Sequence, residues 1–300
     1  MEQENVDFDI RNKSGRALLQ LAASNGHEDV VKLLLDQENL DINSHDAKCM
    51  TSLARASSGG HDAVVKLLER EDIILDQPDS TGGTALKGAV AFGTEEVVRL
   101  LLEREGVDPN HSDNDGGTPL FYAAGFGREG GVKLLLQRNV SLNKPEKEGR
   151  TPLWFATAAG REGIVRLLLE QEGVDTDCKT KKSQTPLQVA AQDGHEGMVK
   201  LLLGREDVNP NYQGNSCRTP RLSAAGARQA GVVKILLERE DIDPNCPDDE
   251  GKAPLTWAAS NGDEESVGLL LQRNDVNPDW LSKTGETPLH FAAVGGHEES

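Results

Sequence analysis

The sequence predicts an all-α solenoid, in which helix–turn–helix units with β-hairpin-like fingers stack on one another. Three observations lead to this fold class. A short motif returns every 33 or 34 residues, and the residues within each copy keep the same order. The composition is also poor in bulky side chains, because hydrophobic residues make up 36 % and aromatic residues 4 % of the 300 residues. Many thin apolar layers fit such a chain better than one large core does.

The motif that anchors each copy is Thr-Pro-Leu or a degenerate form of it, and it predicts the start of a first helix. A threonine hydroxyl caps free backbone N–H groups, and a proline at the first helical position leaves no N–H unpaired. A pair of small residues such as Ala123-Ala124 follows, and it allows this helix to pack closely. The nine anchors begin at Ala17, Thr51, Thr84, Thr118, Thr151, Thr185, Thr219, Ala253 and Thr287.

A glycine such as Gly127 then ends the first helix and reverses the chain, because glycine tolerates the left-handed backbone that such a turn needs. The second helix opens with acids such as Glu95 and Glu96 at its positive end. Six copies place an arginine near its negative end, where the charge complements the helix dipole: Arg70, Arg104, Arg138, Arg205, Arg239 and Arg273.

A polar stretch such as residues 107–110 follows the second helix, and an Asp/Gly turn such as residues 113–116 follows that stretch. This composition is typical of a finger rather than a helix. Two short helices and a finger cannot enclose their own apolar face, so each unit needs its neighbours for stability.

The repeats predict one array over residues 1–300. We expect a partial leading finger at 1–15, about eight full repeats at 16–284 and a truncated last repeat at 285–300. An array cut at both ends would expose apolar surface around Val267, Leu270 and Leu271, and such a surface would favour self-association.

The charge balance argues against two classes of partner. Asp and Glu number 50 against 32 Lys and Arg, which gives a formal net charge of −18 and disfavours both nucleic acid and anionic membranes. The four cysteines form no CxxC pair, so we expect reduced thiols. The first ten residues carry four acids and no apolar run, which is unlike a signal peptide or a membrane span. We therefore expect an intracellular protein, cytoplasmic or nuclear.

The series Thr-Pro-Leu, Ala-Ala, Gly-His, Val-Val and Leu-Leu resembles the ankyrin repeat family over essentially the whole chain. The longer fingers, with Asn-Pro-Asn at residues 209–211, are similar to those of long ankyrin arrays in filamentous fungi. The resemblance implies a curved solenoid whose fingers and first helices line a concave face. It also implies a role in binding other proteins without chemistry.

The copy that begins at Thr219 departs from this pattern. Arg221 replaces the anchor leucine, and Arg228-Gln229 replaces Gly-His. A charged side chain at an apolar position predicts a weakened or locally rearranged unit. Cys49 and Cys217 replace the finger glycine in two other places.

Signals for catalysis, metals and cofactors are weak. The GxGxxG match at residues 125–130 aligns with the turn between two helices in the other copies, and it does not follow a strand. His27, His61, His195 and His297 recur at one repeat position and complete no HExxH motif, which favours hydrogen bonding at helix ends. For His290 the family resemblance suggests a structural bond toward Thr287. No Walker loop or GxSxG elbow is present. We expect no enzyme activity, no metal and no cofactor.

Aromatic residues concentrate between positions 92 and 155. Phe92 and Phe126 occupy one repeat position just before the turn glycine, where the family resemblance places variable contact residues on the groove. Phe121 and Trp154 match each other at the position after the leucine. The alternative is that these aromatics, with Tyr122 and Phe155, fill the interior and compensate for small neighbours.

Charge varies between fingers. Basic residues gather in the fingers of the fifth and sixth copies, whereas residues such as Asp113 and Asp248 make other fingers acidic. These charges either steer a partner or are simply solvated. The predicted partner surface comprises Phe92, Phe121, Phe126, Arg150, Trp154, Lys181 and Lys182. The function we expect is a non-catalytic scaffold for a protein partner. The alternative is the sensor or regulatory arm of a larger signalling protein or enzyme.

Overall fold

The computed structural model describes residues 7–297, and within them it contains seventeen α-helices, one 3-10 helix and no strand. The chain divides into two compact units, residues 1–147 and 148–300. The first unit holds α1 (Leu18–Ser24), α2 (Glu28–Leu35), α3 (Ser52–Gly59), α4 (Asp62–Leu67), α5 (Ala85–Phe92), α6 (Glu95–Glu103), α7 (Pro119–Phe126) and α8 (Glu129–Leu136). The predicted all-α class of helix–turn–helix units is confirmed.

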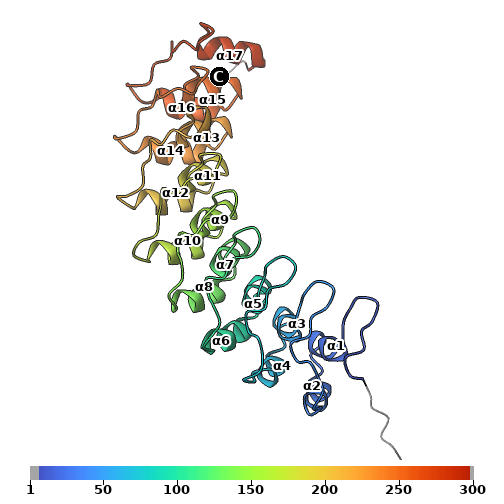
Figure 1. Cartoon of the computed structure of the whole chain (residues 1–300). Coiled ribbons are helices and arrows are strands. Elements are labelled where there is room, and N and C mark those ends of the chain that lie inside the picture. The colour runs from blue at the N-terminus through green and yellow to red at the C-terminus, as the bar shows by residue number, and fades with distance from the viewer. Residues whose placement is uncertain (1–6, 298–300) are drawn as a thin grey trace, which may run out of the picture. The chain divides into compact units, whose positions relative to one another are not determined.

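The second unit repeats the same pattern of short paired helices. It holds α9 (Pro152–Ala158), α10 (Glu162–Leu169), α11 (Pro186–Gln192), α12 (Glu196–Leu203), the 3-10 helix η1 (Asn215–Cys217), α13 (Pro220–Gly226), α14 (Ala230–Leu237), α15 (Pro254–Ser260), α16 (Glu264–Leu271) and α17 (Pro288–Gly295). Within each unit the odd-numbered first helices pack on one another in one row, and the even-numbered second helices pack in a second row (Figure 1).

The anchors act as the sequence predicts. The hydroxyl of Thr118 accepts a hydrogen bond from the Phe121 amide at 3.2 Å, and the following proline is the first residue of α7. Gly127 ends α7 at φ +75°, in the left-handed region that favours glycine. The anchor leucines from Leu19 to Leu187 are at most 2 % exposed, so each of the first six repeats buries one leucine. His290 lies 2.7 Å from the Thr287 hydroxyl, as the resemblance implied.

The fingers are turns and not paired strands. Among the described residues the only bridge of strand type joins His45 and Thr51. In the finger at residues 113–117, a side-chain oxygen of Asp113 accepts the amides of Asp115 and Gly117 at 3.0 and 2.9 Å. These side-chain hydrogen bonds stabilise the finger in place of the backbone hydrogen bonds between the strands of a β-hairpin. One backbone bond, such as Asn114 N–H to Thr81 O at 2.9 Å, links most finger tips to the one before, and within the described residues the seventh finger has no such bond to the sixth.

Polar side chains tie successive repeats together at both helix rows. His61 and His297 bond the carbonyl oxygens of Ser24 and Ser260, at the end of the preceding first helix, at 3.1 and 3.3 Å. The predicted structural role is thus confirmed for these two histidines.

Three of the six arginines near the ends of the second helices, Arg205, Arg239 and Arg273, donate to a carbonyl of the preceding repeat. Arg239 donates to the Leu203 carbonyl at 3.2 Å, at the end of α12, and Arg273 donates to the Leu237 carbonyl at 2.8 Å. Each of these side chains also pairs with the aspartate two residues later. Their positive charge therefore complements the dipole of a neighbouring helix rather than that of their own helix.

Arg221 occupies the leucine position of the seventh repeat and is 1 % exposed. One nitrogen lies 3.5 Å from the Leu236 carbonyl near the end of α14, while Nε and Nη1 have no partner in the described part of the chain. Burial lowers the pKa of this guanidinium to about 10. The seventh repeat thus folds with a buried guanidinium that has few hydrogen-bond partners.

The apolar surface predicted around Val267, Leu270 and Leu271 requires correction. Val267 and Leu270 are 7 % and 0 % exposed, because α16 packs on α14 and α15. Leu271 alone of the three is exposed, at 50 %. Self-association through this end of the array stays a prediction, and the exposed apolar residues there are Leu271, Leu281, Leu289 and Val294.

Candidate partner-binding surface

The first unit exposes two phenylalanines at equivalent places. Phe92 and Phe126 are the last residues of α5 and α7, two first helices that pack together. Phe92 is 66 % exposed and Phe126 is 43 % exposed, so both present aromatic surface to solvent. The ring of Phe126 lies 5.6 Å from that of Tyr122, a contact that limits its freedom before any partner binds.

Phe121 does not belong to this surface, and its inclusion in the predicted site is corrected. Its side chain is 3 % exposed and meets the Tyr122 ring edge-on, with 5.4 Å between the ring centroids. The position after the anchor leucine points into the packed layer between repeats in α7. A phenylalanine there contributes to the apolar core.

Tyr122 belongs to a buried polar centre around the finger carboxylate Asp113. One carboxylate oxygen accepts hydrogen bonds from the Lys87 ammonium and from the Tyr122 hydroxyl, each at 2.5 Å. Burial raises the pKa of Asp113, but these hydrogen bonds outweigh it and hold the pKa below its usual value. Asp113 is 8 % exposed, so this residue holds the finger in place and adds little to an acidic finger tip.

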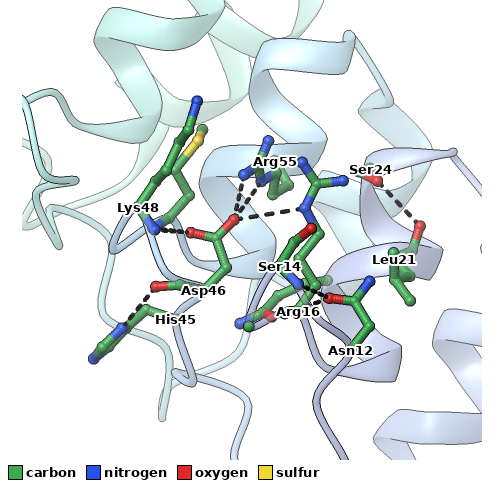
Figure 2. A network of polar contacts seen from close by, with 12 residues as sticks. Asn12, Ser14, Arg16, Leu21, Ser24, His45, Asp46, Lys48 and Arg55 are labelled. Atoms are coloured by element: carbon green, nitrogen blue, oxygen red, sulfur yellow. Dashed lines mark hydrogen bonds and ion pairs between the residues drawn. The ribbon is translucent and has the colours of Figure 1, made fainter.

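In two other fingers a buried aspartate likewise accepts hydrogen bonds from side chains. Asp46 pairs with Arg55 and Arg16, from the first helix of its own repeat and the finger before it, and its other oxygen accepts the Lys48 amide at 2.8 Å (Figure 2). Asp248 accepts the indole N–H of Trp257 at 2.8 Å. Finger carboxylates are therefore structural in the second, fourth and eighth repeats.

In the second unit, three predicted residues meet at one hollow. We call it the Trp154 hollow; it has a volume of about 200 Å³ and is lined by Glu148, Arg150, Trp154, Thr180, Lys182 and Gln184. These residues come from two neighbouring fingers and the first turn of α9. The indole Nε1 of Trp154 is buried and has no hydrogen-bond partner within the described residues.

A second hollow, the Gln188 hollow, adjoins the first and shares Lys182 and Gln184 with it. Its volume is about 230 Å³, and Gln188, Gly214 and Arg218 contribute to its lining. The amide of Gln188 donates to the Arg218 carbonyl at 2.5 Å, which fixes the next finger across this hollow. We call these two hollows of the second unit, with their lining residues, the strip.

The predicted cations occupy different places along this strip. Lys182 lines both hollows, and Arg150 lines the Trp154 hollow while it lies 5.6 Å from the Phe155 ring. Lys181 is exposed and lines neither hollow, and its backbone amide bonds the Glu148 carbonyl at 2.8 Å. Phe155 itself is half-buried.

Sequence reasoning missed Arg218, which lines the Gln188 hollow and lies 4.7 Å from the Trp257 ring. The sequence could have indicated Arg218, since the position just before the anchor holds Arg150, Arg218 and Lys252 in the fifth, seventh and eighth copies. Cations at one register of a stacked array necessarily lie along one face.

The described residues contain no group of three or more side chains suited to hold a metal ion. The GxGxxG match lies in α7, the turn after it and the start of α8, and it follows a helix. Burial raises the pKa of the Cys178 thiol to about 12, so this thiol stays protonated.

A comparison with protein-family models identifies ankyrin repeats (3 copies) at residues 1–79, 72–146, 139–214, 171–248 and 222–300. The chain belongs to the ankyrin repeat family. Ankyrin repeats are generally protein–protein interaction modules and are typically non-catalytic. A search of curated proteins found no significant match. Within residues 7–297, none of the helices has the length and hydrophobicity required to span a membrane.

Proposed function

We propose that the chain is a non-catalytic scaffold that binds a protein partner through its first helices and fingers. In this proposal both units belong to one repeat array of residues 1–300, and each unit contributes a contact surface. The observation that carries the proposal is the pair of exposed aromatic rings at one register, with Phe92 66 % and Phe126 43 % exposed. Large apolar side chains left in solvent at equivalent positions of packed helices are typical of interaction sites.

The two surfaces differ in chemistry. Phe92 and Phe126 offer rigid aromatic anchors, which bury apolar area at low entropic cost. The strip in the second unit offers Arg150, Lys182 and polar hollows for an acidic part of the partner. Lys181, which is exposed outside the hollows, contributes to the attraction of such a partner during encounter.

A second candidate function is a sensor or regulatory arm of a larger multidomain protein. The same aromatic and basic surfaces would then contact an effector domain of that protein. Gene context separates the two candidates, because the second requires an effector domain in the same polypeptide.

The test compares bait variants in affinity capture with quantitative mass spectrometry. Leu33 on α2, a second helix, is 67 % exposed and provides a matched control for Phe92. A partner should bind the parent chain and Leu33→Ala equally, and should lose about 2 kcal/mol or more of binding free energy with Phe92→Ala or Phe126→Ala. Thermal melting checks that each variant is folded.

Equal capture by the parent and both phenylalanine variants, together with loss in Leu33→Ala, would contradict the proposal. Binding would then involve the second helices. Capture that depends on added RNA and weakens steeply with salt would instead favour nucleic acid as the partner.

A further inference from the structure

The side chain that follows the anchor leucine has a recurring task in this array. In three repeats it donates a hydrogen bond to the finger of the next repeat. Gln20 donates to the Ser44 carbonyl at 2.7 Å, Lys87 to the Asp113 carboxylate at 2.5 Å, and Gln188 to the Arg218 carbonyl at 2.5 Å. Trp154 holds this position in the fifth repeat, so its indole N–H lies where a donor to the sixth finger is expected.

The sixth finger lacks the carboxylate that the fourth and eighth fingers provide. In these three fingers, the backbone N–H of one residue donates to the carbonyl oxygen four residues later. The donor residues of these bonds therefore occupy equivalent positions. Asp113 bonds Gly117 O, Asp248 bonds Lys252 O and Thr180 bonds Gln184 O, at 3.1, 3.0 and 3.2 Å. Thr180 therefore stands where the fourth and eighth fingers hold a carboxylate, and the seventh and ninth fingers hold Gly214 and Ser282 there. Its hydroxyl accepts the Gln184 amide at 3.2 Å, which copies one of the two tasks of the aspartate.

Trp154 differs from the other two tryptophans because its indole N–H has no acceptor among the described residues. Trp257 Nε1 donates to the Asp248 carboxylate at 2.8 Å, and Trp280 Nε1 donates to the Gly251 carbonyl at 2.9 Å. Trp154 Nε1 is buried with no partner inside residues 7–297, and the Trp154 side chain lines the Trp154 hollow. A buried N–H without an acceptor costs free energy, so an acceptor from outside would be favoured there.

We propose that the Trp154 hollow binds an aspartate or glutamate side chain from an extended segment of the partner protein, whose carboxylate accepts the Trp154 indole hydrogen bond. The incoming carboxylate takes the place that Asp113 and Asp248 fill in their own fingers. This proposal rests on the proposed function, and it assigns the chemistry of the partner at one of its two surfaces.

The charge of the hollow supports a carboxylate over a neutral acceptor. Lys182 lines the hollow, and its ammonium has no ion pair or hydrogen bond within the described part of the chain. Arg150 adds a second positive charge, and Glu148 removes one. The remaining net positive charge in a partly desolvated hollow favours an anion. The adjoining Gln188 hollow has room for a neighbouring residue of the same segment.

The experiment follows the indole N–H signals of the full chain by NMR. The chain has three tryptophans, and Trp154→Phe identifies which signal belongs to Trp154. The probe is acetyl-Ala-Glu-Ala-Glu-Ala-amide, added to millimolar concentration. The matched peptides carry glutamine in place of glutamate, either amidated or with a free terminal carboxylate. We expect the glutamate peptide to move the Trp154 signal in a saturable way, and the amidated glutamine peptide to leave it in place.

Substitutions at the hollow provide a second readout. Lys182→Gln should weaken binding of the glutamate peptide at least about fivefold, whereas Lys181→Gln, outside the hollow, should change it less than about twofold. Thr180→Asp should restore the missing internal acceptor, move the Trp154 signal without peptide, and weaken peptide binding at least about tenfold. Thr180→Asn, a neutral control of the same shape, should leave most of the binding intact.

Several outcomes would overturn the assignment. No saturable movement of the Trp154 signal would exclude a carboxylate site there. An equal response to the amidated glutamine peptide would show a neutral carbonyl acceptor, and a response only to the free terminal carboxylate would show recognition of a chain end. The proposed function would survive each of these results if Phe92→Ala and Phe126→Ala still abolished capture of a protein partner.

Discussion

Arg221 illustrates how a single residue changes the energetics of one layer of the stack. Every other anchor position from Leu19 to Leu255 buries a leucine, but the seventh repeat buries a guanidinium there. Its one contact, 3.5 Å from the Leu236 carbonyl, uses the negative end of a helix and leaves two nitrogens unpaired. Desolvating a charge with so few partners opposes folding.

The first prediction is that Arg221→Leu raises the free energy of unfolding by about 1 to 3 kcal/mol, because it removes the buried charge and restores an apolar contact. Urea denaturation followed by circular dichroism measures this change as a later transition. Lower stability would instead show that the contact of Arg221 with the end of α14 is worth more than its desolvation costs.

The second prediction concerns Asp113, whose pKa lies below its usual value in the folded chain. A carboxyl group with a depressed folded pKa stabilises the protein fully above its unfolded pKa, about 3.9, and this stabilisation is lost as the pH falls through the folded pKa. Asp113→Asn should therefore destabilise the chain by about 1 to 3 kcal/mol at neutral pH, and the difference should shrink in acid.

Thermal melting between neutral pH and acid pH measures this difference. Asp115 provides the control, since its side chain is 75 % exposed in its pair with Lys147, and Asp115→Asn should have little effect. A constant difference between Asp113→Asn and the parent at all pH values would mean that the charge of Asp113 does not matter.

At the scale of helices and fingers, most of the architecture could be predicted because its signals are local. Thr118 caps its own helix, and Gly127 ends it, so a window of ten residues contains both causes. The targets of long side chains could not be predicted in this way. Arg239 reaches the end of a helix 36 residues earlier, and the finger aspartate Asp113 is buried by Lys87 from the preceding repeat. These contacts exist only once the repeats are stacked.

The third prediction concerns the seventh repeat as an element. Ser216, Cys217 and Arg228 adopt φ values of 57°, 54° and 59°, in the left-handed region that costs free energy without glycine. Together with Arg221 they predict the least stable repeat of the second unit. Hydrogen–deuterium exchange should be faster in α13 and α14 than in α11 and α12.

Arg228→Gly should slow this exchange, because glycine is the residue at this turn in the other copies and accepts the left-handed backbone. An increase in stability of about 0.5 to 1 kcal/mol is expected. Uniform exchange across the four helices, with no response to Arg228→Gly, would show that the strain is compensated within the repeat.

At the scale of the whole molecule, the period of the sequence indicated which residues vary between repeats but not how deeply each is buried. Phe121 and Trp154 share one register, yet Phe121 packs inside while Trp154 lines a hollow. The next finger holds Glu146 after Phe121 and Thr180 after Trp154. Phe92 and Phe126, at the ends of their helices, lie beyond the packed layer and were correctly expected at the surface.

The measurement that tests the central claim most directly is a hydrogen–deuterium exchange footprint of the chain with its captured protein partner. The account predicts slower exchange on binding at the ends of α5 and α7 and in the fingers at residues 144–150 and 179–184, with little change in the second helices α2, α4, α12 and α14. Protection confined to those second helices, with unchanged exchange around Phe92, Phe126 and Trp154, would contradict the claim that the first helices and fingers bind the partner.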